Sequence, residues 1–111
     1  MTREEHLLTI LAEECSEVAH RVSKALRFGV EEVQPGQSLT NAERIKVEFV
    51  DLLGAWEMLV GAGVVIPVTS RDDDAINAKI GKVNLFLDFS VARGLVDGEV
   101  GDPSTPHPEA K

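Results

Sequence analysis

The chain has 111 residues, which is enough for one small domain. Its 11 Lys and Arg residues against 19 Asp and Glu residues give a net charge of −8. That charge argues against a nucleic-acid polymer or an anionic membrane as the main partner. It does not exclude a small anionic ligand, because a bound divalent cation can reverse the local sign of the charge.

The cysteine content and the N-terminus indicate the expected location. A single cysteine, Cys15, cannot form a disulfide within one chain. Residues 1–10 carry charges and no signal-peptide pattern. The apolar run 58–68 is too short to span a bilayer. We therefore expect a protein of the reducing cytoplasm.

The first segment with helical periodicity runs from about Arg3 to Phe28, where Gly29 is a natural stop. Its apolar stripe consists of Leu8, Leu11, Cys15, Val18, Val22 and Leu26. We expect this stripe to face the core of the protein, with Cys15 as a buried thiol.

The second periodic segment follows a loop that contains the turn pair Pro35-Gly36. Thr40 and Glu43 form a capping box, with Thr40 as the N-cap. The sequence therefore predicts a helix from Asn41 to about Val60. Its apolar stripe consists of Ile45, Phe49, Leu52, Trp56 and Leu59.

The third periodic segment is predicted to begin after Ser70 as N-cap and to place Asp72, Asp73 and Asp74 in its first turn. It should run to about Arg93 and stop at Gly94. The remaining residues, 95–111, are rich in proline and glycine and have no apolar period. We expect them to form a disordered tail.

The predicted fold is all-α, a helical bundle with three main helices in a single domain, 1–94. A chain this short buries only a modest fraction of its surface. We therefore expect a homo-oligomer, a dimer or a tetramer, to complete the bundle.

Each predicted helix carries two charged residues three positions apart at the rim of its apolar stripe. Residues at this spacing are neighbours on a helix surface. The pairs are Glu14 and Glu17, Glu48 and Asp51, and Lys79 and Lys82.

Two interpretations of these pairs are open. The acids could belong to solvated helix faces, with Glu17 pairing with Arg21 and Glu48 with Arg44. Alternatively, the carboxylates converge and bind a hard cation, Mg²⁺ or Mn²⁺, which offsets their repulsion. The lysines could then hold phosphates.

The complete pattern resembles a known family. "EECSE" is E-E-x-x-E, "EFVD" is E-x-x-D, and thirty residues separate them. Together with K-x-x-K on the third segment, this resembles the MazG-like all-α NTP pyrophosphatases, the superfamily of dimeric dUTPases and phosphoribosyl-ATP pyrophosphohydrolase. The resemblance covers about Glu4 to Gly94. It implies Mg²⁺-dependent hydrolysis of a nucleoside triphosphate to the monophosphate and pyrophosphate by a dimer-completed bundle.

The resemblance also implies roles for single residues. Glu14, Glu17, Glu48 and Asp51 would be the metal ligands. Glu13 would hold a further metal ion or orient the attacking water, which makes it the candidate catalytic residue.

Several further residues have two interpretations each. Trp56 packs in the core or stacks on a nucleobase. Asn84 is a solvated side chain or reads a base edge, and Arg27 could reach a phosphate. Glu17 with His20 forms half of a di-iron motif. A non-catalytic helical dimer that serves as a binding or regulatory module is the alternative to an enzyme.

Overall fold

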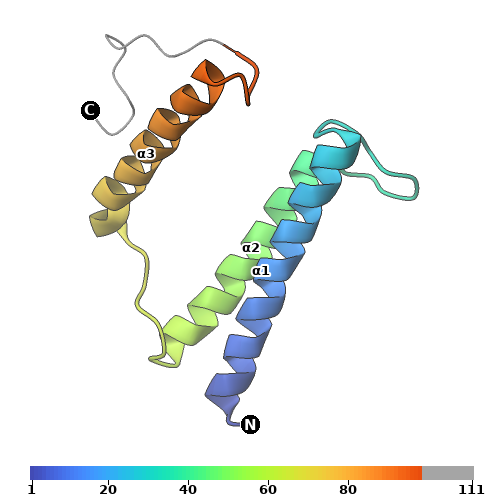
Figure 1. The fold of residues 1–111 in the computed structure, drawn as a ribbon. Helices are drawn as coiled ribbons and strands as arrows, with labels where there is room; N and C mark the ends of the chain where they lie inside the picture. Colours follow the sequence, from blue (N-terminus) through green and yellow to red (C-terminus); the bar gives the residue numbers. More distant parts are fainter. Residues whose placement is uncertain (99–111) are drawn as a thin grey trace. The chain divides into compact units, whose positions relative to one another are not determined.

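The computed structural model describes residues 1–98, which contain three α-helices, one short 3₁₀ helix and no strand. The helices are α1 (Arg3–Phe28), α2 (Asn41–Gly61), η1 (Ser70–Asp72) and α3 (Asp73–Ala92) (Figure 1). They belong to two compact units, of which the first is Met1–Pro67 and the second begins at Val68. The all-α prediction is confirmed.

Helix α1 is closed by hydrogen bonds at both ends. Thr2 Oγ1 accepts from Glu5 N at 3.1 Å, and Thr2 N donates to Glu5 Oε1 at 3.3 Å. This capping box was not predicted from the sequence. At the other end, Gly29 has a φ of 96° and donates its N–H to Ala25 O. A glycine suits this stop because other residues rarely adopt such a backbone conformation.

The connection between α1 and α2 is tied to the start of α2 by Asn41, which is 2% exposed. Its Nδ2 donates to Gly29 O at 2.8 Å and to Glu32 Oε1 at 3.3 Å. The predicted Thr40–Glu43 capping box is confirmed. These bonds fix where α2 begins.

Helices α1 and α2 lie side by side and antiparallel (Figure 1). Within the described residues the buried apolar side chains are Leu7, Ala25, Ala55 and Leu59. The predicted core stripe of α1 is wrong in part. Leu8, Val22 and Leu26 are 42%, 40% and 83% exposed, and the thiol of Cys15 is exposed. Helix α1 has apolar residues on two adjoining stripes, so periodicity alone could not show which of them faces α2.

The second unit begins with η1. The predicted N-cap Ser70 is wrong, because Ser70 is the first residue of η1 and Thr69 is its cap. Thr69 Oγ1 accepts from Arg71 N at 3.2 Å, and Thr69 N donates to Asp72 Oδ2 at 2.9 Å. Helix α3 therefore starts at Asp73, with Asp73 and Asp74 in its first turn.

None of the helices in residues 1–98 has the length and apolarity needed to cross a bilayer. Residues 95–98, the start of the predicted tail, form bends. The rest of that prediction, 99–111, lies outside the described residues.

Candidate metal centre

Three of the predicted ligands come together across the first unit. Glu14 of α1 and Glu48 and Asp51 of α2 each offer a carboxylate oxygen, and these oxygens lie within 4.8 Å of one another. Glu14 and Glu48 are half-buried, whereas Asp51 is exposed. The site therefore opens to solvent on the α2 side.

The line along which α1 and α2 face each other, the seam, explains this placement. A step of seven residues is almost two full turns, so Leu7, Glu14 and Arg21 lie on one line along α1. Leu7 is buried, and the other two are half-buried. On α2 the same spacing joins Asn41, Glu48 and Ala55, of which the first and last are buried. Charged side chains thus occupy seam positions that apolar residues usually fill.

The pKa of Glu14 shows the cost of this arrangement. Loss of hydration raises the pKa of its carboxyl above the ordinary value, and the negative charges of Asp51, Glu48, Glu17 and Glu13 raise it further. The group therefore gains from anything that adds positive charge beside it, either a proton or a metal ion.

The three carboxylate oxygens are close enough together to hold one metal ion. Two ligand oxygens on opposite sides of an ion with bonds of about 2.1 Å lie about 4.2 Å apart. The three oxygens lie within 4.8 Å of one another, so they could contact the same ion. Oxygen-only ligands favour hard ions. No histidine belongs to the metal-capable group found in residues 1–98, and a di-iron centre requires histidines.

The surface ion pairs of the alternative interpretation are not formed in the part of the chain that the structure describes. Arg44 Nη1 instead donates to Gln34 Oε1 at 3.0 Å. Arg21 Nε is buried without a hydrogen-bond partner. The acids are therefore not neutralised by the two nearest arginines.

The remaining predicted acids lie close to the group of three. Glu13 and Glu17 are exposed and are not members of it. Their charges nevertheless raise the pKa of Glu14.

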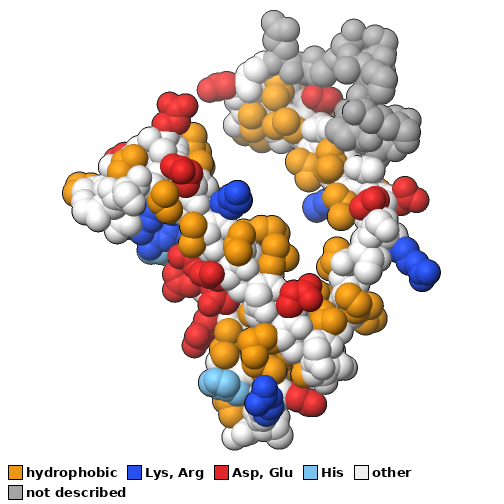
Figure 2. All heavy atoms as spheres, turned by 180° about the vertical axis from the view of Figure 1, so that it is seen from behind, with side chains coloured by type: hydrophobic (Ala, Val, Ile, Leu, Met, Phe, Trp, Pro, Cys, Tyr) orange, Lys and Arg blue, Asp and Glu red, His pale blue; other side chains and the backbone are white. Residues whose placement is uncertain are grey.

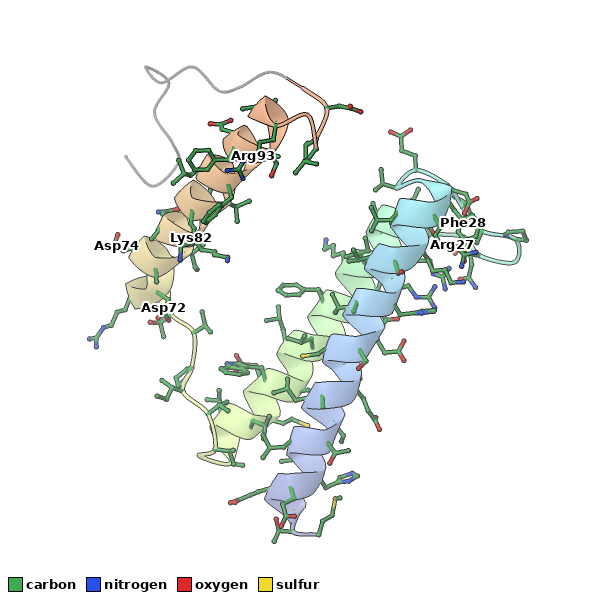
Figure 3. The ribbon with its side chains drawn as sticks, viewed as in Figure 1. Arg27, Phe28, Asp72, Asp74, Lys82 and Arg93 are labelled. Carbon is green, nitrogen blue, oxygen red and sulfur yellow. The ribbon has the colours of Figure 1, made fainter. Side chains whose placement is uncertain are left out.

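The predicted phosphate and base contacts are spread over both units. Lys79 and Lys82 are exposed and Asn84 is half-buried on α3, in the second unit. Trp56 is half-buried on α2, and its Nε1 is buried without a partner. Arg27 lies beside Phe28 at the end of α1 (Figure 3), with Cζ 4.9 Å from the ring centroid. Their roles toward a substrate stay predictions.

Two residues beside the centre, Arg21 and Arg44, were considered in the sequence only as partners in surface ion pairs. The signal that could have identified them is their spacing. Arg21 follows Glu14 by seven residues, and Arg44 precedes Asp51 by seven. Each arginine therefore lies on the same side of its helix as an acid of the centre.

Comparison with protein-family models, with curated proteins and with solved structures finds no match to this chain.

Proposed function

We propose that this chain is a Mg²⁺-dependent nucleoside triphosphate pyrophosphohydrolase of the MazG-like all-α superfamily. The observation that supports this most is the convergence of Glu14, Glu48 and Asp51 in the seam of α1 and α2. These are three of the four acids that the E-E-x-x-E and E-x-x-D motifs designate as ligands. Mn²⁺ is the alternative ion, since it also prefers oxygen ligands.

The proposed reaction is attack of water on the α-phosphorus of the nucleotide. The bond from the α-phosphorus to the oxygen that bridges to the β-phosphorus breaks, and pyrophosphate leaves. A bound Mg²⁺ ion would neutralise charge on the phosphate oxygens and lower the pKa of a coordinated water. Glu13, an exposed carboxylate next to Glu14, would accept the proton of the attacking water. Lys79 and Lys82 would contact phosphates as point charges.

We further propose that the protein works as a homo-oligomer, because α2 is apolar on sides that α1 does not cover. At about 100° per residue, Val47 and Val50 lie about 100° and about 160° around α2 from the buried side of Ala55 and Leu59. Val47 and Val50 are 45% and 52% exposed. Together with Leu39 they line an open hollow of about 360 Å³.

A second exposed face of α2 lies between the side of Val47 and Val50 and the side that α1 buries. Phe49 and Leu53 are 49% and 43% exposed there. Exposed apolar side chains on more than one side of a helix favour packing against further helices. Helix α1 covers neither of these faces, and a second copy of the chain is the proposed partner.

The experiment that tests the enzyme proposal is a panel of ribo- and deoxynucleoside triphosphates incubated with Mg²⁺. Pyrophosphate and orthophosphate release are scored separately. We expect pyrophosphate release by the wild type, its loss in Glu14→Gln, and its retention in Glu57→Gln, which changes an exposed glutamate elsewhere on α2. No release with any nucleotide would favour the non-catalytic dimer.

Light scattering tests the oligomer separately. We expect a dimer or a tetramer at micromolar concentration. A stable, folded monomer at that concentration would contradict the proposal.

A further inference from the structure

The carboxylate centre has a basic neighbour on the same unit. Seen from behind, Lys and Arg side chains gather beside Asp and Glu side chains near the end that carries the 29–40 loop (Figure 2). The chain as a whole carries a net charge of −8, so such a concentration of cations is unusual for it. Two arginines of this unit, Arg21 and Arg44, are half-buried.

The antiparallel register brings these two arginines to the same level. Glu14 lies opposite Glu48 and Asp51. Arg21 follows Glu14 by seven residues along α1, and Arg44 precedes Asp51 by seven residues along α2. Both steps cover about 10.5 Å in the same direction along the helix pair. Arg21 and Arg44 therefore lie at about the same level of the helix pair, one step beyond the acids.

Neither arginine is committed to a carboxylate within residues 1–98. Arg44 uses Nη1 to donate to Gln34 Oε1 at 3.0 Å, which holds the guanidinium in place and leaves its other N–H groups available. Arg21 has its Nε buried without a partner. Buried donors are normally hydrogen-bonded, so the unpartnered Nε of Arg21, at the level of a second half-buried arginine, indicates a ligand with acceptor oxygens.

We propose that Arg21 and Arg44 form the subsite for the pyrophosphate leaving group of the substrate, an inference that rests on the proposed function. With the α-phosphate at the carboxylates, the β- and γ-phosphates extend along the seam toward the arginines. The planar guanidinium fork matches the oxygens of a phosphate. The two arginines then bind the negative charge that the leaving group gains as the bond breaks.

The test uses inorganic pyrophosphate with Mg²⁺ as the probe and calorimetric titration as the readout. For Arg21→Gln and Arg44→Gln we expect pyrophosphate affinity to fall by about tenfold or more each, the usual effect of losing a charge-assisted hydrogen bond. The control is Arg3→Gln, an exposed cation at the start of α1, which should bind as the wild type does. Thermal melts with Mg²⁺ alone should show the wild-type metal response in all three variants.

The outcomes separate this inference from the proposed function. A wild type that responds to Mg²⁺ but does not bind pyrophosphate would overturn the inference, and so would wild-type affinity in both arginine variants. A wild type with no Mg²⁺ response would overturn the proposed function first, and the inference with it. If Arg44→Gln does not fold, Arg44→Lys keeps the charge without the fork and should still weaken pyrophosphate binding.

Discussion

Replacing Glu14 with glutamine separates a metal site from an ordinary helix seam. Glu14 is the only member of the three-carboxylate group that α1 supplies. Glutamine keeps its size and removes its charge. Without metal, we expect the variant to be at least as stable as the wild type. The raised pKa of Glu14 shows that its charge is disfavoured by lost hydration and by four neighbouring carboxylates.

The expected magnitude follows from mass action. An ion that binds only the folded protein stabilises it by about 2.7 kcal/mol at one hundred times its dissociation constant. For a domain of this size that corresponds to a rise of about 10 °C or more in Tm. Thermal melts followed by circular dichroism, with and without Mg²⁺, measure this rise directly. The variant has lost one of three ligands and should lose most of it.

Two further variants make the melting experiment specific. Glu57→Gln removes an exposed acid of α2 outside the centre and should keep the full Mg²⁺ shift. Glu17→Gln removes a charge that acts on Glu14 from outside the group of three, and its Mg²⁺ shift should lie between those of the other variants. Equal Mg²⁺ shifts in the wild type and Glu14→Gln would refute the reasoning.

Three other predictions concern the fold and its pH dependence. Asn41→Ala should lower the free energy of unfolding by about 1–3 kcal/mol in urea titration, because the Gly29 carbonyl loses the donor that the buried Asn41 side chain supplies. Thr40→Ala should cost about 1 kcal/mol near neutral pH. Hydrogen bonds from the backbone and side chain of Thr40 hold the pKa of Glu43 below 4.5. The cost of Thr40→Ala should therefore shrink in acid, as pH falls through this pKa. In the metal-free wild type, the carboxyl of Glu14 binds its proton more tightly in the folded state than in the unfolded state. The wild type should therefore lose stability as pH rises from 4.5 through the raised pKa of Glu14. A stability difference between the wild type and Glu14→Gln that stays constant across this range would contradict the prediction.

The helices could be predicted from the sequence because their signals are local. Gly29 ends α1 through its backbone conformation, and Thr40 with Glu43 starts α2 through hydrogen bonds three residues apart. Thr69 was missed because a neighbouring residue, Ser70, is an equally good cap by composition. The hydrogen bonds that Thr69 forms with Arg71 N and Asp72 Oδ2 identify Thr69 as the cap.

The seam was harder to predict because it depends on which stripe of α1 meets α2. The periodicity favoured the stripe of Leu8 and Cys15, whereas the structure buries Leu7 and places Glu14 on the same line. The two acid motifs were identified by their spacing alone. What spacing could not show was that Glu14, rather than Glu17, lies in the group with Glu48 and Asp51.

Hydrolysis in H₂¹⁸O tests the central claim most directly. The wild type is incubated with Mg²⁺ and a nucleoside triphosphate that it accepts, and both products are analysed by mass spectrometry. Attack of water on the α-phosphorus predicts one ¹⁸O atom in the nucleoside monophosphate and none in the pyrophosphate, with no turnover by Glu14→Gln. Label in orthophosphate or in pyrophosphate, or equal turnover by Glu14→Gln, would contradict the account.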